Sequence, residues 1–191
     1  MVLCIILLFL HHGSGTTLQC VIDAIQNKTL NANISLVVSN NPDAYALQRA
    51  KDAGIDTYVI KNKKTFEIDE ELFIKLQNYK IDLILLAGYL RMIGENLLNN
   101  YTIINTHPSL LPKFGGKGMY GMNVHKAVIE AHEEYSGVTL HYVNNEYDKG
   151  NIIRQTKVKV EPTDTAETLS SKVQKVEKLQ LVEELQKIVN E

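Results

Sequence analysis

Short apolar runs alternate along this chain with segments of helical periodicity, and this alternation constrains the fold more than any other feature. Residues 2–10 and 81–87 are nearly continuous apolar runs, which predict strands buried on both faces. Residues 152–160 instead alternate apolar and polar side chains, as a half-exposed edge strand does. Four shorter runs predict the remaining strands, at residues 34–38, 57–60, 102–105 and 138–143. The sequence therefore predicts an α/β fold with a mostly parallel sheet, helices on both faces and an antiparallel edge.

Capping residues predict where several helices begin. Asn41 followed by Pro42 is typical of an N-cap and a first helical position, and predicts a helix to about residue 53. Asp69 is predicted to cap a second helix, and Asp164 with Glu167 has the spacing of a capping box at the start of the last helix. In such folds ligands bind at the carboxyl ends of the strands, so a site is expected in the loops that follow the strands.

Composition and charge narrow the function classes. With 191 residues, of which 45% are apolar, the chain suits a single domain, 1–191, that needs no metal or disulfide to fold. The formal net charge of -2, without a block of lysine or arginine, argues against nucleic acid as a partner. Cys4 and Cys20 lack metal-site spacing, and the run 2–10 has neither the length to span a bilayer nor the features of a signal peptide. Small molecules are therefore the expected ligands.

The loop from Gly13 to Thr17, after the first strand, is a candidate anion site. It has the sequence Gly-Ser-Gly-Thr-Thr and precedes a helix, so backbone N–H groups and the helix dipole would point at a ligand above the sheet edge. Leu18 stands where a dinucleotide-binding fingerprint requires its third glycine. The pattern leaves open a phosphate site and a plain tight turn.

Asn105 and His107 form the most informative pair, because they lie two residues apart at a strand end and so face the same side of the chain. An amide N–H and an imidazolium aimed at one point can stabilise a developing oxyanion, and loss of one such donor typically costs about 3 to 4 kcal/mol of barrier. The alternative is a structural histidine whose hydrogen bonds are satisfied within the loop. The following loop, to Gly121, is long and rich in proline and glycine, which is typical of loops that bind a ligand.

Asp148 is the third candidate, on a turn after a strand predicted to run beside the strand that ends in Asn105. A carboxylate within about 4 to 6 Å of His107 would favour the imidazolium and raise its pKa. An acidic residue before Lys149 and Gly150 is also a common turn residue, so both interpretations stay open.

Together these segments resemble the glycinamide ribonucleotide formyltransferases over nearly the whole chain. The motifs that carry the resemblance are the Gly-Ser-Gly-Thr loop, Leu85-Leu-Ala-Gly-Tyr-Leu-Arg-Met-Ile93, Asn105-x-His107-Pro-Ser-Leu-Leu-Pro112, Gly137-Val-Thr-Leu-His141-Tyr-Val143 and Tyr147-Asp148-Lys-Gly150. The chain departs from the family pattern at His12 and Thr17, where relatives usually carry a small residue and an asparagine. The resemblance implies a formyltransferase-type Rossmann-like fold. Residues 1–100 would form a phosphate-binding half and residues 101–191 a catalytic and folate-binding half.

The resemblance also implies roles for individual residues. Asn105, His107 and Asp148 correspond to the family's catalytic trio. The implied substrate-binding residues lie on the phosphate loop and the last helix: Gly13, Gly15, Thr16, Thr17, Gln174 and Glu177. The implied folate-binding residues are Lys64 or its neighbour Lys63, Leu90, Arg91, Met92, Ile93, Asn105, Asn144 and Asn145. The glycine-rich segment 114–121 is expected to be a mobile substrate loop.

The implied reaction transfers the formyl group of 10-formyltetrahydrofolate, a co-substrate, to the amine of glycinamide ribonucleotide in de novo purine biosynthesis, without a metal. The resemblance implies a cytoplasmic enzyme, monomeric or homodimeric, with no membrane partner. Formyltetrahydrofolate hydrolase and methionyl-tRNA formyltransferase share the trio, but they would require a further domain before residue 1 or after residue 191. A non-enzymatic nucleotide-binding module, in which His107 and Asp148 are incidental, is the alternative from another class.

Overall fold

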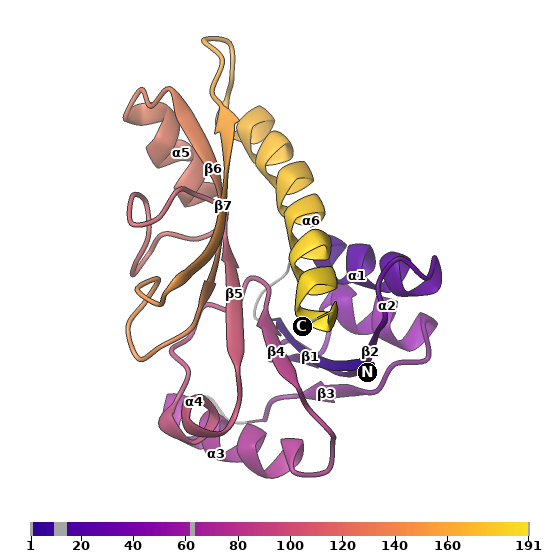
Figure 1. Ribbon diagram of the computed structural model, residues 1–191. Helices are drawn as coiled ribbons and strands as arrows, with labels where there is room; N and C mark the ends of the chain where they lie inside the picture. Colours follow the sequence, from indigo (N-terminus) through magenta and orange to yellow (C-terminus); the bar gives the residue numbers. More distant parts are fainter. Residues whose placement is uncertain (1, 10–14, 62–63, 191) are drawn as a thin grey trace.

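The computed structural model describes residues 2–9, 15–61 and 64–190, which form a seven-stranded sheet of order β3-β2-β1-β4-β5-β6-β7 (Figure 1). Neighbouring strands from β3 to β5 pair in parallel, whereas β5–β6 and β6–β7 pair antiparallel. The strands are β1 (Leu3–Phe9), β2 (Ala32–Ser39), β3 (Thr57–Val59), β4 (Leu83–Leu86), β5 (Ile103–His107), β6 (Tyr135–Tyr142) and β7 (Ile152–Lys159). The predicted α/β fold with an antiparallel edge is confirmed.

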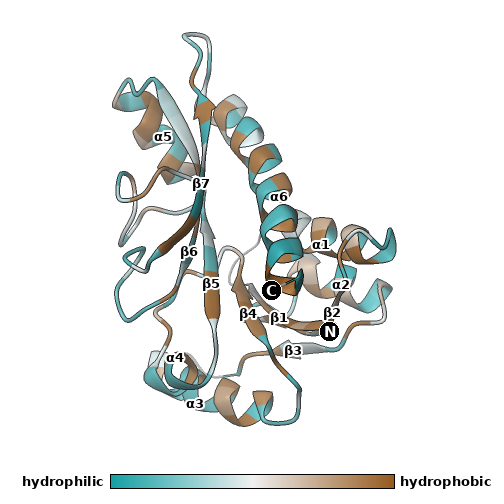
Figure 2. Ribbon diagram, in the orientation of Figure 1, coloured by the Kyte–Doolittle hydropathy of each residue, from teal (hydrophilic) through white to brown (hydrophobic). Residues whose placement is uncertain are grey.

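Helices cover both faces of the sheet because the central strands are apolar on both sides. Ile5 and Leu7 of β1 belong to a core with the first two helices and the end of the last one, whereas Ile6 belongs to a second core with the third and fourth helices. Figure 2 shows hydrophobic residues along β1, β4 and β5. None of the helices, as far as the structure describes the chain, has a stretch long and apolar enough to cross a bilayer. The helices are α1 (Thr16–Gln26), α2 (Tyr45–Asp52), α3 (Thr65–Leu76), α4 (Glu95–Asn100), α5 (Met122–Glu130) and α6 (Ala166–Asn190).

Two of the predicted helix starts are wrong in detail. α2 begins later than Asn41, whose side chain instead accepts a hydrogen bond from the backbone N–H two residues on and closes a turn. At the start of α6, the backbone N–H groups of Thr165 and Thr168 bond each other's hydroxyls at 2.9 and 3.3 Å. The capping box therefore lies one residue after the predicted pair, Asp164 and Glu167.

Asp69 caps a helix, but not the predicted one. It lies inside α3, is only 4% exposed, and accepts the backbone N–H groups of Asn96 and Leu97 at 3.0 and 3.2 Å. A carboxylate from α3 thus caps the first turn of α4, a short helix of six residues. A contact between distant segments replaced the local cap that the sequence suggested.

The order of the strands brings the predicted sites to one edge of the sheet. From β1 the chain builds outward to β2 and β3 on one side, and then to β4 and β5 on the other. Neighbouring carboxyl ends at such a reversal flank a crevice, the usual place for a ligand in open α/β sheets. The predicted phosphate loop follows β1, the predicted folate wall follows β4, and Asn105 and His107 end β5.

Candidate active site

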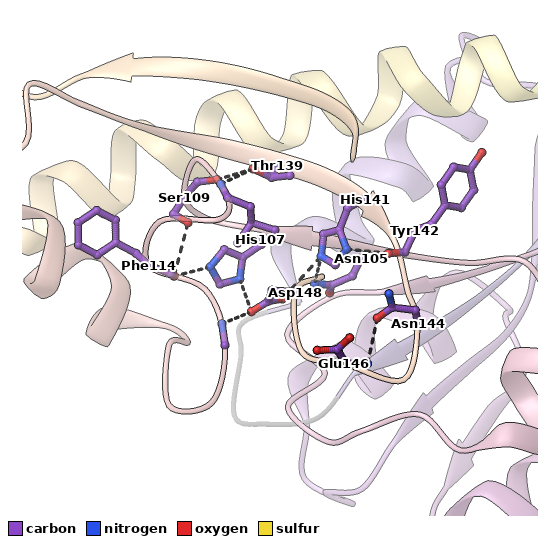
Figure 3. Close-up of polar contacts among 12 residues, drawn as sticks. Asn105, His107, Ser109, Phe114, Thr139, His141, Tyr142, Asn144, Glu146 and Asp148 are labelled. Atoms are coloured by element: carbon purple, nitrogen blue, oxygen red, sulfur yellow. Dashed lines mark hydrogen bonds and ion pairs between the residues drawn. The ribbon is translucent and has the colours of Figure 1, made fainter. Parts of the chain in front are cut away.

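A polar cluster forms where β5, β6 and the turn after β6 meet (Figure 3). In the antiparallel register Asn105 lies opposite His141, and Nδ2 of Asn105 lies 3.1 Å from Nε2 of His141. His107, which is 4% exposed, ends β5 on the same side as Asn105. The turn carries Asp148 between the two imidazoles, so the structure brings together the three residues predicted to be catalytic.

Asp148 is held from several sides. Its Oδ2 lies 3.6 Å from Nδ1 of His107, and its Oδ1 lies 3.6 Å from Nε2 of His141. Oδ2 also accepts the backbone N–H of Gly116 at 2.7 Å. A Cβ on Gly115 would lie 3.2 Å from Cβ of Asp148, so a glycine there lets the loop approach the carboxylate this closely. Asp148 itself has a φ of 56°, a left-handed conformation that aspartate tolerates better than most residues.

Backbone carbonyls fix one nitrogen of each imidazole. Nε2 of His107 donates to the carbonyl of Phe114, and Nδ1 of His141 donates to the carbonyl of Tyr142, both at 2.8 Å. The loop that supplies the Phe114 carbonyl is anchored to β6, because the hydroxyl of Thr139 donates to the carbonyl of Ser109 at 2.7 Å. The ring orientations are therefore set by the folded backbone before any ligand arrives.

The pKa of His107 departs from the sequence-based expectation. Burial lowers it below the ordinary value of 6.5, and the attraction of Asp148 raises it only in part. The contribution of Asp148 thus has the expected sign, but desolvation of the ring is larger and leaves the net pKa of His107 lowered. Burial of Asp148 works to raise the pKa of that carboxyl, but the contacts with His141, His107 and Gly116 outweigh it and leave the pKa below 3.8.

A different carboxyl group, that of Glu177 in α6, lies on the opposite side of β5. Thr106, between Asn105 and His107, points to the α6 side, where its hydroxyl and that of Thr17 hydrogen-bond Glu177. Glu177 keeps some exposed surface, yet desolvation of its carboxyl raises the pKa to about 7, against the lowering effect of these bonds and of Lys178. Glu177 thus joins α6, β5 and the start of α1.

The backbone at the start of α1 lies very close to the backbone of α2. Gly15 is buried with a φ of 65°, and a Cβ there would lie 2.9 Å from Cα of Ala46 in α2. Thr16 and Thr17 form the first turn, and no side chain of the described residues caps it. Uncapped first-turn N–H groups are suited to an anion, and the phosphate site stays a prediction. Gly13 and His12 lie outside the described residues.

Gln174, also predicted to bind the ribonucleotide, lies on α6 one turn before Glu177. Its side chain is exposed, and its Nε2 donates to the hydroxyl of Ser170 at 3.3 Å. The structure therefore places Gln174 on the helix that carries Glu177, in contact with Ser170 of the same helix.

The predicted folate wall is the segment between β4 and α4. Leu90, Arg91 and Met92 are partly exposed there, whereas Ile93 is 5% exposed and packs in the core with α3 and α4. Ile93 can therefore support the wall from beneath but offers little surface to a ligand.

The remaining predicted folate residues lie in the turn after β6 and at the start of α3. Asn144 accepts the backbone N–H of Glu146 at 2.9 Å in the turn after β6, and Asn145 beside it is exposed. Lys64, at the start of α3, has a side chain 82% exposed and forms an ion pair with Glu67 at 3.2 Å. This contact of Lys64 is local to the start of α3, and Lys63 lies outside the described residues.

His141 is the residue that sequence reasoning missed. It belongs to one of the motifs that carry the family resemblance, but no role followed from it. Thr139 and His141 are polar side chains at alternate positions of a buried strand, both at most 2% exposed, and they pair across from His107 and Asn105. That alternation beside β5 was the available signal. Among the described residues, no group of three or more histidine, cysteine, aspartate or glutamate side chains is arranged to hold a metal ion.

Comparisons with known proteins agree with this geometry. Residues 6–185 match the formyl transferase family model. A phosphoribosylglycinamide formyltransferase of Haemophilus influenzae is 38% identical over 170 residues, which cover 86% of this chain and 78% of that protein. The chloroplastic protein of that name from Arabidopsis thaliana is 40% identical over 167 residues, or 84% of this chain, and the chain spans 57% of its length.

Solved structures show the same architecture. The crystal structure of the phosphoribosylglycinamide formyltransferase of Bacillus halodurans superposes with a TM-score of 0.89 and 32% identity, covering 97% of this chain and 95% of that one. The corresponding structure from Coxiella burnetii gives a TM-score of 0.86 and 37% identity, covering 97% and 86%. The chain therefore belongs to the formyl transferase family.

Proposed function

We propose that this protein transfers the formyl group of 10-formyltetrahydrofolate to the amine of glycinamide ribonucleotide, in de novo purine biosynthesis. The observation that carries the proposal is the convergence of Asn105, His107 and Asp148 at the carboxyl edge of the sheet. The relatives named for this activity support the choice of substrates. The chain spans a little over half the length of the plant relatives. The proposed activity is therefore argued from the geometry of the site as well as from the names of the relatives.

In the proposed chemistry the amine attacks the formyl carbon, and negative charge develops on the formyl oxygen. In this proposal Nδ2 of Asn105 and protonated His107 donate to the oxyanion. The Asp148 carboxylate supports the proton on His107 and accepts a proton from the attacking amine, which is then returned to the leaving nitrogen of the folate. Atoms balance without a metal, because one proton leaves one nitrogen and one arrives at the other.

The two substrates are assigned to neighbouring strand ends. The ribonucleotide phosphate is placed at the start of α1, at Gly13, Gly15, Thr16 and Thr17, with Gln174 and Glu177 alongside. The folate is placed against residues 90–93, with Asn144 and Asn145 near the pterin and Lys64 toward the glutamate tail. In this arrangement residues 1–100 chiefly hold the phosphate, and residues 101–191 supply catalysis and folate contacts. We also propose a cytoplasmic enzyme that acts as a monomer or homodimer.

A spectroscopic assay tests the proposal. The protein is mixed with glycinamide ribonucleotide and a formyl-folate analogue, and release of the deformylated folate is followed. We expect turnover that requires the ribonucleotide. Deformylation that proceeds equally well without the ribonucleotide would identify a hydrolase, and no deformylation with both substrates present would remove the formyl transfer activity altogether.

A further inference from the structure

One carboxylate faces two buried imidazoles in the catalytic cluster, which raises the question of which ring carries the proton between them. His107 and His141 are 4% and 2% exposed, and each presents one nitrogen to Asp148 at 3.6 Å. The two distances do not distinguish the rings. Their other hydrogen-bond partners do.

Each ring already donates one proton to a backbone carbonyl. Phe114 supplies the acceptor for Nε2 of His107, and Tyr142 supplies the acceptor for Nδ1 of His141. A carbonyl can only accept, so both of these nitrogens carry hydrogen. A neutral imidazole has only one N–H, so the nitrogen that faces Asp148 is a bare acceptor in either ring unless that ring is charged.

Asn105 distinguishes the two rings. Its Nδ2, which can only donate, lies 3.1 Å from the nitrogen of His141 that faces Asp148. That nitrogen must therefore accept, which makes His141 the neutral ring. Among the described residues, Nδ1 of His107 has no such donor, and its charged neighbour is the Asp148 carboxylate.

We propose that His141 is a positioning residue that acts through Asn105. Its neutral imidazole accepts one N–H of the carboxamide, fixes the plane of that group, and leaves the second N–H for the developing oxyanion. Because the same bond occupies the Nε2 lone pair of His141, His107 is the histidine whose ring nitrogen is left to exchange a proton with Asp148. The inference rests on the proposed function only in taking Asn105 and His107 as the oxyanion donors.

The protonation state of His141 can be measured directly in the native protein. Long-range ¹H–¹⁵N correlation spectra of protein labelled with ¹⁵N-histidine assign the tautomer of each ring, and the His141 signals are identified by their loss in His141→Gln. We expect a neutral His141 with hydrogen on Nδ1 at neutral pH. A charged ring, or hydrogen on Nε2, would overturn the inference whatever the enzyme activity.

Substitution tests the functional side. His141→Leu removes the acceptor, and we expect kcat to fall roughly 10-fold to 100-fold, the scale of a misplaced reacting group, with the ribonucleotide KM nearly unchanged. In His141→Gln the side-chain carbonyl can accept the same N–H, so part of kcat should return. Equal losses of kcat in both variants would contradict an acceptor role.

A double-mutant cycle separates positioning of Asn105 from other effects. In an Asn105→Ala background there is no carboxamide to hold, so adding His141→Leu should lower kcat by less than about 3-fold more. A full additional loss would show that His141 acts elsewhere, through Asp148 or the fold, and would overturn the inference. An unchanged kcat in Asn105→Ala alone would instead refute the proposed function. If the leucine variant does not fold, the tautomer measurement decides.

Discussion

Two carboxyl groups lie on opposite sides of β5, and their pKa values are shifted in opposite directions. Asp148, on the side of Asn105 and His107, has a pKa below 3.8, whereas Glu177, on the side of Thr106, has a pKa raised to about 7. Burial acts to raise the pKa of both. The difference must come from what each carboxyl group contacts.

The contacts explain the contrast. Asp148 lies beside His107 and accepts the backbone N–H of Gly116, and both contacts favour its charged form. Glu177 forms hydrogen bonds with the hydroxyl groups of Thr106 and Thr17, and these bonds do not compensate for the lost hydration of its carboxyl group. The pleat of one strand thus separates an ionised group suited to proton transfer from a group that changes charge near neutral pH. We expect the first to control turnover and the second to control ribonucleotide binding.

Removing His107 should give the largest effect. His107→Ala deletes a proposed oxyanion donor, and loss of such a donor costs about 3 to 4 kcal/mol, or roughly 10²- to 10³-fold in kcat. Steady-state kinetics with both substrates, together with ribonucleotide binding by calorimetry, measures the two effects separately. A large loss of ribonucleotide affinity with little change in kcat would make His107 a binding residue and break the contrast between the two faces.

Asp148→Asn should come next. The substitution removes the charge that favours a protonated His107, so the pKa of His107 should fall further and kcat should drop by roughly 10²-fold or more. The matched comparison is Glu177→Gln, the same change of charge on the other face, which should leave more of kcat. Unchanged turnover in Asp148→Asn would remove this carboxylate from the mechanism.

Glu177→Gln should alter the pH dependence of stability. Between pH 4.5 and about 7 the folded protein holds a proton on Glu177 that the unfolded chain lacks, so the stability from this group is lost as pH rises through that window. The variant should therefore gain stability relative to the parent at pH 8, by roughly 2 kcal/mol after solvent screening is allowed for.

Thermal unfolding of both proteins at pH 5 and pH 8 checks this expectation. His107 and His125 act in the opposite sense, because burial lowers the pKa of each and folding releases their protons. Both are present in parent and variant, so the difference between the two proteins isolates Glu177. A difference that does not change with pH would mean that Glu177 titrates near its ordinary value.

Glu177→Gln should also weaken ribonucleotide binding, and this is the smallest of the expected effects. A hydrogen bond to a charged group exceeds one to a neutral group by about 1 to 1.5 kcal/mol, so Glu177→Gln should raise the ribonucleotide Kd about 10-fold and leave the folate Kd unchanged. Glu183→Gln, which neutralises an exposed carboxylate on the same helix, is the matched control and should change neither. Weakening of both ligands alike would point to a general disturbance of α6.

Sequence patterns were sufficient where the cause was local. The apolar runs predicted the strands of the sheet, because residues buried on both faces must be apolar on both faces. The two-residue spacing of Asn105 and His107 predicted a shared side, since alternate side chains of a strand point the same way. The placement of a glycine between β1 and α1 likewise agreed with its positive φ.

Local patterns failed where distant segments compete for the same group. Asp69 looked like the cap of its own helix, but in the folded chain its carboxylate accepts two N–H groups of α4. His141 carried no signal that separated it from other strand residues until the register placed it opposite Asn105.

The sequence by itself determined the class of fold, the segments that form its strands, and the residue types that meet at the sheet edge. Only the tertiary structure decided the charge of these groups and their partners, including the lowered pKa of His107 and the second imidazole beside Asp148. The physical reason is that hydrophobic periodicity is a property of neighbouring residues, whereas desolvation and hydrogen bonding depend on what the rest of the chain places around each group.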